Sequence, residues 1–550
     1  MLMLRPRHAC PLGVLLAILL EASAVAKPPS LEHLFPAGAQ RGQSVAVTAT
    51  GSFDRWPPLV WTDGEGADLV VTPEKDKGKL TIKVAPDAKV GIHWIRIHDE
   101  EGTTDLRPFV VGLLPEAVEA GSLSIADPPH VTINGTLAKK GESDQYSVHL
   151  LKGQTLLATV DANQGLKSPM DSVLQVASAE GFVLAQNDDE HGMDPQIAFV
   201  APEDGNYLVR IFTFPSVPNS TIAFAGNAAY IYRLTLTTRG FVDFPYPMAI
   251  AGDAGATVEA FGWNVPESAR KLPITFKADE PVGTVIHPEL GNAIEVRRAS
   301  GRSELEHEPN DLEHPQTIVV PSMISGRLEQ AKDRDVFAFP AKKGEALTFR
   351  LEARVLDSPL DPVLTIVDAT GKTLVEADDA RRNRNPELLF SAPEDGTYRL
   401  IVRDLSDHGG ERYVYGIEAT ATVPDFQLSV GTEWFTVENG KTLSLPVTIE
   451  RKNGFNRPIE IRLEGFPAGV EATSVRSEPE GDSSKAVTLT LTSKGTAGSA
   501  PIQVVGKAVG GPKVERLAQL PAPGRLALPA WLTVLKPGTV ATPVETKAKK

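Results

Sequence analysis

The sequence predicts an all-β protein built from tandem β-sandwiches, and three observations support this fold class. Apolar and polar residues alternate with a period of two in many short segments, among them 347–355, 443–449 and 487–491. Such alternation is typical of half-buried antiparallel strands. No long segment shows the 3.6-residue period of an amphipathic helix. The 550 residues include 46 glycines and 44 prolines, which favours many turns between short strands.

Residues 1–26 have the features of a secretory signal peptide. They contain a basic start, a leucine-rich apolar run and the small-x-small motif Ala24-Val25-Ala26, after which cleavage would leave Lys27 as the first residue. The apolar run is too short for a membrane span, and no later apolar stretch reaches about 18 residues. We expect an exported protein that is periplasmic, on the cell surface or extracellular; the alternative is an uncleaved N-terminal anchor.

The rest of the chain is expected to alternate between sandwiches and repeated modules. The predicted order is an Ig-like β-sandwich at 28–115 (the N-terminal sandwich), module 1 at 120–238, a small Ig-like β domain at 240–300 (the middle domain), module 2 at 303–423, an Ig-like β-sandwich at 425–520 (the C-terminal sandwich) and a flexible tail at 521–550. Composition predicts the tail, because it is rich in proline, alanine and lysine.

Alternating segments justify the three sandwiches. The N-terminal sandwich contains Gln43–Ala49 and Gly91–Ile97, and the middle domain contains Ala256–Trp263. The C-terminal sandwich contains three alternating segments. Each segment has the length and period of a strand with one buried face.

Modules 1 and 2 are expected to be two copies of one unit, because a series of short motifs recurs in the same order. The matched pairs include Asp144–Tyr146 with Asp335–Phe337, Lys152–Gln154 with Lys343–Glu345, Ser168–Asp171 with Ser358–Asp361, Ala201–Tyr207 with Ala392–Tyr398, and Tyr230–Tyr232 with Tyr413–Tyr415. The longest match contains the turn tetrapeptide Pro-Glu-Asp-Gly. The tyrosine after it begins the next strand, and its ring is expected to cover the end of the core.

Module 2 carries five motifs whose order and spacing are specific: Glu306–Asp311, Gly326–Leu328, Asp333–Phe339, Ser358–Leu364 and Ala392–Tyr398. They resemble the bacterial pre-peptidase C-terminal domain family, and module 1 resembles the same family more loosely. The alternation with Ig-like domains resembles large secreted proteins of planctomycete-type bacteria. The resemblance implies a jelly-roll-like β-sandwich that is appended to secreted proteins, often beside proteases, with relatives that bind collagen or polysaccharide.

The same resemblance implies a calcium site in module 2. Collagen-binding relatives hold Ca²⁺ with a linker of the pattern Glu-x-Glu-x-Asn-Asp, completed by carboxylates just before a Tyr/Phe strand. The corresponding candidate ligands are Glu306, Glu308, Asn310, Asp311, Asp333 and Asp335. Calcium takes six to eight oxygen ligands, which carboxylates and amides supply. The alternative is a solvated linker whose proline and asparagine form a turn.

Module 1 departs from this pattern. The segment Ser124–His130 before its first predicted strand lacks the acidic motif, and Asp144 remains alone, so no calcium is expected there. The loop Asn187–Asp194 is dense in oxygen ligands. It is interpreted either as a second calcium loop or as an acidic loop between strands, and the arginines in the module 2 copy favour the second interpretation.

Composition and motifs also restrict the function classes. The net charge of −15 disfavours nucleic acid as the main partner, because phosphate binding requires a basic face. The only cysteine, Cys10, excludes a disulfide framework. No His-Glu-x-x-His or Gly-x-Ser-x-Gly motif occurs, and the histidines lack ligand spacing, so no catalytic residue is predicted. The scattered tryptophans suit core positions or, if exposed, sugar stacking.

We therefore expect an exported, non-enzymatic binding or adhesion protein that recognises polysaccharide or extracellular protein, with module 2 as the candidate for stabilisation by Ca²⁺. One alternative is a structural envelope spacer with no ligand beyond ions. Another is an accessory subunit of a secreted protease. Neither nucleic acid nor a membrane is an expected partner.

Overall fold

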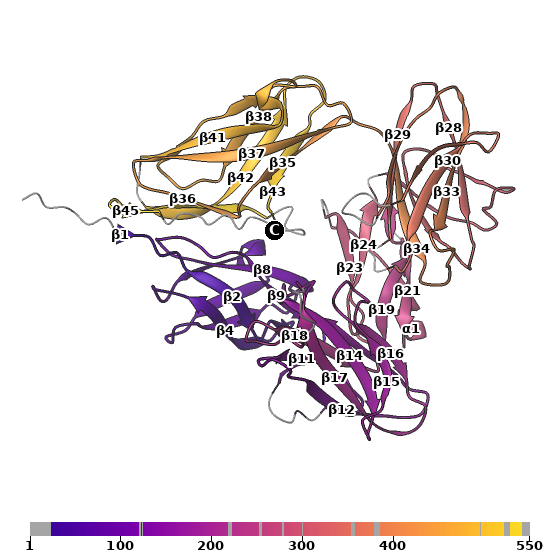
Figure 1. The fold of residues 1–550 in the computed structure, drawn as a ribbon, viewed down its shortest axis with the longest axis horizontal. Coiled ribbons are helices and arrows are strands. Elements are labelled where there is room, and N and C mark those ends of the chain that lie inside the picture. The colour runs from indigo at the N-terminus through magenta and orange to yellow at the C-terminus, as the bar shows by residue number, and fades with distance from the viewer. Residues whose placement is uncertain are drawn as a thin grey trace, which may run out of the picture.

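The computed structural model describes residues 24–119, 123, 125–217, 223–251, 256–277, 280–299, 301–353, 358–378, 385–494, 497–521 and 528–541. Within these ranges nearly every element is a strand, and the strands pair into sandwiches that follow one another along the chain (Figure 1). The predicted fold class, all-β with tandem β-sandwiches, is confirmed. Across the described ranges no helix has the length and apolar character needed to cross a bilayer. Residues 1–23 of the predicted signal peptide lie outside the described residues.

Two four-stranded sheets form the N-terminal sandwich, in the orders β2-β4-β7-β6 and β3-β9-β8-β5. The strands are β2 (Ser30–Phe35), β3 (Gly38–Gln40), β4 (Ser44–Ser52), β5 (Leu59–Thr62), β6 (Leu69–Pro73), β7 (Lys79–Val84), β8 (Gly91–His98) and β9 (Arg107–Gly112). Alternate residues point inward, as Leu80 and Ile82 of β7 do, and these are buried completely. Removal of this apolar face from water drives formation of the core.

Modules 1 and 2 have the same strand arrangement, except that the short strand β26 adds a fifth strand to one sheet of module 2. In module 1 the sheets are β10-β11-β18-β13-β16 and β12-β17-β14-β15; in module 2 they are β25-β27-β34-β29-β32 and β26-β28-β33-β30-β31. Module 1 contains β10 (Glu116–Val118), β11 (His130–Thr136), β12 (Asp144–Leu150), β13 (Thr155–Asp161), β14 (Met170–Ser178), β15 (Val183–Asn187), β16 (Gln196–Val200), β17 (Gly205–Pro215) and β18 (Ile231–Thr237). Module 2 contains β25 (Arg302–Leu305), β26 (Gln316–Thr317), β27 (Ser322–Arg327), β28 (Asp335–Ala341), β29 (Ala346–Glu352), β30 (Pro362–Val367), β31 (Thr373–Ala377), β32 (Glu387–Ser391), β33 (Gly396–Asp404) and β34 (Val414–Ala421).

The repeated turn has the same hydrogen bonds in both modules. Tyr207 and Tyr398 are almost completely buried, and each hydroxyl donates to the main-chain oxygen four residues earlier, at 2.8 Å. The turn aspartates, Asp204 and Asp395, accept from a main-chain N–H of the facing Lys-Gly turn at 2.6 and 2.7 Å. The tyrosine rings therefore close one end of each core, as the sequence predicts.

The middle domain is the smallest unit and has two three-stranded sheets, β19-β21-β22 and β20-β24-β23. Its elements are β19 (Phe241–Tyr246), β20 (Ala249–Ala251), β21 (Thr257–Trp263), α1 (Glu267–Arg270), β22 (Lys271–Pro273), β23 (Val282–Val285) and β24 (Ile294–Ala299). Val258, Ile294 and Val296 are buried in its core.

The C-terminal sandwich extends beyond residue 520. Its strands are β35 (Asp425–Val430), β36 (Trp434–Val437), β37 (Thr442–Lys452), β38 (Ile459–Glu464), β39 (Val470–Ala472), β40 (Val475–Ser477), β41 (Ala486–Ser493), β42 (Gly498–Ala508), β43 (Glu515–Gln519) and β44 (Ala530–Val534). Strand β44 lies between β36 and β42, and all of its residues are buried. The predicted flexible tail is therefore wrong for 530–540. The short apolar strand Ala530–Val534 was not predicted, because the stretch around it is rich in proline and resembles a loop in composition. This strand completes a sheet.

The C-terminal sandwich also packs against the N-terminal sandwich (Figure 1). Trp94 and Leu106, from the N-terminal sandwich, belong to the apolar core of the C-terminal one. The Leu106 N–H donates to Glu433 Oε2 at 3.1 Å, and β1 (Ala24–Val25) pairs in parallel with β45 (Thr539–Val540). The last sandwich thus returns to the first, and the two ends of the described chain lie together.

Candidate metal centre

The acidic linker of module 2 runs from one sheet of the sandwich to the other. It leaves β25, which pairs with β27, and reaches β26, which pairs with β28 in the opposite sheet. The Glu306 N–H donates to Ser325 O at 3.0 Å, and the Val336 N–H donates to Asn310 O at 2.6 Å. These main-chain bonds hold the linker against the start of β28, where Asp335 lies.

Four of the six predicted ligands converge there. Glu308, Asp333 and Asp335 each offer a carboxylate oxygen, and these oxygens lie within 4.8 Å of one another. The end of the buried Asn310 amide lies 3.1 Å from both Glu308 Oε1 and Asp335 Oδ1. With its nitrogen on that side, the amide donates to both carboxylates. With its oxygen on that side, the amide joins the carboxylates as a ligand for a shared cation.

Glu306 lies behind this cluster rather than in it. Its Oε1 accepts from the Arg327 N–H at 2.6 Å, and its Oε2 lies 3.2 Å from the Tyr415 hydroxyl. That hydroxyl also forms a short hydrogen bond with Asp335 Oδ2. Burial raises the pKa of Glu306 to about 7 and raises the pKa of Asp335 well above its usual range. Without a cation, the Glu306–Asp335 pair therefore retains a proton near neutral pH.

Asp311 does not reach the cluster. Its exposed Oδ1 accepts from the main-chain N–H groups of Glu313 and His314 at 2.8 and 2.9 Å, so its carboxylate shapes its own turn. Asp333 accepts from the N–H groups of Glu329 and Arg334 at 2.7 and 2.9 Å, which fixes its carboxylate at the mouth of the cluster. Glu308, Asn310, Asp333 and Asp335 therefore form the cluster. Glu306 lies behind this cluster and Asp311 lies outside it.

The convergent set is chemically suited to a hard cation. Three carboxylates and an amide supply oxygen ligands from the linker and from the approach to β28, and the cluster extends from exposed Glu308 to buried Asp335. Oxygen ligands from flexible segments suit Ca²⁺ better than Mg²⁺, which requires near-ideal octahedral geometry. Water or main-chain oxygens could complete the shell at the exposed side. These residues therefore fit a calcium ion.

Module 1 has the buried part of this arrangement without the ligands. Tyr232 donates to Asp144 Oδ2 at 2.7 Å, and the Tyr146 and Tyr232 hydroxyls lie 2.6 Å apart. The sequence suggested that Asp144 stands alone. In the structure, Glu119 lies within hydrogen-bonding reach of it. Glu119 also accepts from the Thr136 N–H at 3.0 Å, at the end of β11.

Glu119 is the counterpart of Glu306, since Thr136 and Arg327 both end the strand beside the linker. Sequence reasoning missed it because the linkers of the two modules have no other residues in common. The repeated tyrosine could have pointed to Glu119. The hydroxyl of Tyr232 and that of Tyr415 each bond a buried aspartate, and a second acid lies beside that aspartate in both modules.

The acidic loop Asn187–Asp194 serves packing in this structure. Buried Asp194 accepts from the N–H groups of Ala162, Asn163 and Gln164. Glu190 forms an ion pair with Arg412 of module 2 at 2.8 Å, and Arg412 also pairs with Asp243 of the middle domain at 2.6 Å. The loop thus contributes to a joint between three units.

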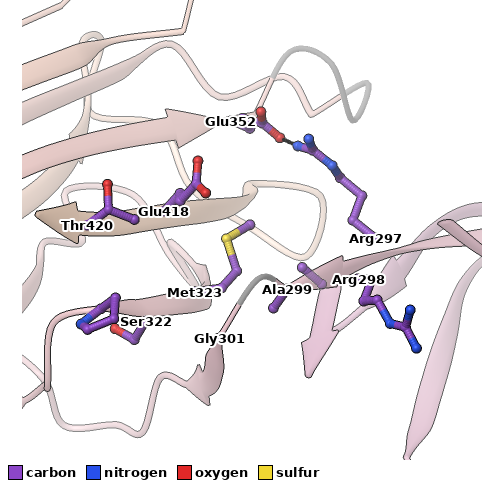
Figure 2. Close-up of a pocket in the computed structure, with 11 residues that line it drawn as sticks. Arg297, Arg298, Ala299, Gly301, Ser322, Met323, Glu352, Glu418 and Thr420 are labelled. Atoms are coloured by element: carbon purple, nitrogen blue, oxygen red, sulfur yellow. Dashed lines mark ion pairs between the residues drawn. The ribbon is translucent and has the colours of Figure 1, made fainter. Parts of the chain in front are cut away.

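A second joint lies between the middle domain and module 2 around a hollow of about 120 Å³. Figure 2 shows Arg297 of β24 pointing toward Glu352, with which it forms an ion pair, while Met323, Glu418 and Thr420 line the opposite side. The ion pair ties the two units across the hollow. Arg297 and Glu352 therefore have a structural role at this joint.

No model of a known protein family matches the chain. A stretch of 164 residues is 29% identical to a probable subtilase-type serine protease of Deinococcus radiodurans, covering 28% of this chain and 20% of that protease. The pre-peptidase C-terminal domain of a Bacillus anthracis collagenase matches 22% of this chain over 99% of its own length, with 15% identity and a TM-score of 0.16. The four N-terminal Ig domains of Dscam1 match 92% of this chain and 96% of theirs, with 10% identity and a TM-score of 0.18. The chain spans about a fifth of the curated relative that it matches.

Proposed function

We propose that this is an exported, non-catalytic binding protein that recognises polysaccharide or extracellular protein through its β-sandwiches, with module 2 clamped by Ca²⁺. The observation that supports this most directly is the convergence of Glu308, Asn310, Asp333 and Asp335 where the linker meets the sandwich. A cation there would hold the linker at the start of module 2 against the sandwich. It would thereby fix the orientation of module 2 relative to the middle domain.

Calcium calorimetry on the full chain tests the clamp. We expect saturable Ca²⁺ binding and a higher melting temperature with the ion, since a ligand that binds only the folded state stabilises it by mass action. Glu308→Gln combined with Asp333→Asn should abolish both effects. Asp188→Asn combined with Asp189→Asn removes two exposed acids from module 1 and should change neither. Equal binding by both double variants would contradict this site.

Retention of the full chain by insoluble polysaccharides and by immobilised matrix proteins tests the binding function. Saturable retention by one of them is expected, whereas a spacer would be retained by none. A second candidate, an accessory subunit of a protease, is favoured by the shared stretch with the subtilase-type protease. Co-purification of a peptidase with the native protein, together with no retention by any polymer, would support that candidate instead.

A further inference from the structure

The outer face of one sheet of module 1, β12-β17-β14-β15, is unusual for the surface of a sandwich. Along β17, buried Tyr207, Val209 and Ile211 alternate with residues that point outward and are only half-buried. The outward residues are Leu208, Arg210, Phe212 and Phe214. This face carries two neighbouring rows of side chains, one of hydrogen-bonding groups and one of aromatic rings.

The hydrogen-bonding row crosses all four strands. The pairing register places Gln145 of β12 beside Arg210, Arg210 beside Gln175 of β14, and Gln175 beside Gln186 of β15. Arg210 Nε donates to Gln145 Oε1 at 2.8 Å, and Gln175 Nε2 donates to Gln186 Oε1 at 2.7 Å. These hydrogen bonds fix the long side chains in a preformed array. The amide and guanidinium groups of the array retain further donors and acceptors for a ligand.

The aromatic row lies next to it on β17. Phe224, from the segment that follows β17, stacks on Phe214 with ring centroids 5.2 Å apart and planes 23° apart, and meets Phe212 edge-on at 5.5 Å. Phe224 is 48% exposed. A large ring left half in water beside fixed polar groups is typical of a binding surface rather than of a core.

The charge around this face points to an uncharged ligand. Asp171 lies opposite Phe214 on β14. Partial burial raises the pKa of Asp171, and the nearby exposed acids Asp189 and Asp188 raise it further. These acids would repel an anionic polymer, while the single arginine of the row already bonds Gln145 and Gly181. Amide and guanidinium groups next to aromatic rings suit the hydroxyls and the apolar C–H faces of pyranose rings.

Module 2 provides an internal comparison, because the same face is different there. At the positions of Gln145 and Arg210 it has Val336 and Ile401, which are paired in the same register and buried in a small apolar cluster with Val367. Leu405 occupies the position of Phe214. The two copies therefore share a fold but not this surface.

We propose that the outer face of β12-β17-β14-β15 binds a neutral polysaccharide, with Phe224 as the stacking platform and the Gln145–Arg210–Gln175 row as the hydrogen-bonding partner. This inference rests on the proposed binding function and names its ligand class and its site. It assigns the binding to module 1 and leaves module 2 without an equivalent surface.

Affinity gel electrophoresis of the full chain, with soluble neutral polysaccharides (β-glucan, xylan, mannan) and anionic ones (alginate, pectin), tests the proposal. We expect at least one neutral polymer to retard the protein and the anionic polymers to have no effect. Phe224→Ala should weaken retardation at least tenfold, and Gln145→Ala with Arg210→Ala should do the same. Leu405→Ala, an exposed change at the corresponding face of module 2, should leave it unchanged.

Circular dichroism and melting curves of each variant separate loss of binding from loss of fold. Retardation that is unchanged in both module 1 variants, or that occurs only with anionic polymers, would overturn this inference. If the protein binds only an immobilised matrix protein, this inference fails while the proposed binding function stands. If neither polymers nor matrix proteins bind, both fail.

Discussion

In both modules a buried aspartate bonds a tyrosine hydroxyl and lies beside a linker glutamate, but the groups around it differ. Two carboxylates removed from water cannot both stay ionised without a proton or a cation between them. In module 1, Tyr146 extends the network by bonding Tyr232, whereas Phe337 stands at that position in module 2 and has no hydroxyl to offer. Module 2 instead places Glu308 and Asn310 beside its buried Asp335. The same buried acid thus suits a proton in one copy and a cation in the other.

The buried Asp144 of module 1 predicts a pH-dependent stability. Burial raises the pKa of Asp144 to about 7, whereas an unfolded aspartate loses its proton near pH ~4. Between these values the folded state binds more protons, so this group stabilises the fold at low pH and the stabilisation is lost as the pH rises toward 7. Asp144→Asn should flatten this part of the profile. Melting temperatures at several pH values between about 4 and 8 check it, and an Asp188→Asn control should keep the wild-type slope.

The acid pair of module 2 predicts that Ca²⁺ binding releases a proton. The ion requires ionised carboxylates, while burial raises the pKa of Glu306 to about 7. Calcium affinity should therefore increase as the pH rises from about 6 to 8. Calorimetry in two buffers of different ionisation enthalpy measures the released proton. Affinity that is independent of pH, with no buffer dependence of the heat, would contradict this linkage.

At the level of single residues, the sequence predicted the acids that converge but not their arrangement. The spacing of Glu306, Glu308 and Asn310 matched a known pattern, yet the structure turns Asp311 toward its own loop and sets Glu306 behind the cluster. These outcomes depend on which main-chain N–H groups lie within reach of each carboxylate. Those contacts form only once the linker runs between β25 and β28 in the folded module, so its sequence alone does not predict them.

At the level of elements, period-two alternation predicted the strands well because each strand buries one face. The same rule failed for β44, whose five residues are buried on both faces and therefore do not alternate. A short apolar run after a proline-rich stretch resembles a loop in composition. It becomes a strand because it pairs with β42 and with β36, which lies much earlier in the sequence.

The position of β44 predicts the effect of two truncations. Ending the chain after Leu520 removes Trp531, Leu532 and Val534, which are buried in the molecule, and exposes the edges of β36 and β42. Losing several large apolar side chains at about 2–5 kcal/mol each exceeds the stability of a typical domain, so the C-terminal sandwich should unfold. Ending the chain after Ala541 keeps β44 and β45 and should leave the melting temperature nearly unchanged. Proteolysis and calorimetry distinguish the two, and equal stability would contradict the structural role of β44.

At the level of the whole molecule, the contacts between units could not be predicted from sequence. The joint between the first and last sandwiches depends on buried polar groups such as Arg96 and Glu433, and on Trp531, which contacts Trp61 and His98. Isolated polar residues have no periodic signal, and their partners lie hundreds of positions away. Alternation identifies each core but says nothing about which surfaces of separate cores meet.

This joint predicts that the chain behaves as one closed assembly and that a single substitution opens it. Arg96 is 1% exposed, its Nη1 donates to Thr104 O at 3.0 Å, and its Nη2 lies 3.8 Å from Glu433 Oε2, which also accepts from Leu106. Removing one member of a buried ion pair costs about 3–5 kcal/mol, because the other charge stays buried without compensation.

Glu433→Ala should therefore weaken the joint without removing either apolar core. We expect a larger radius of gyration in small-angle X-ray scattering and a separate, earlier calorimetric transition for the C-terminal sandwich. Glu471→Ala, an exposed acid paired with Lys494 on the same sandwich, is the matched control and should scatter like the wild type. If Glu433→Ala keeps the wild-type radius and a single transition, the apolar contacts of Trp94, Leu106 and Trp531 hold the joint alone, and the ion pair contributes only specificity.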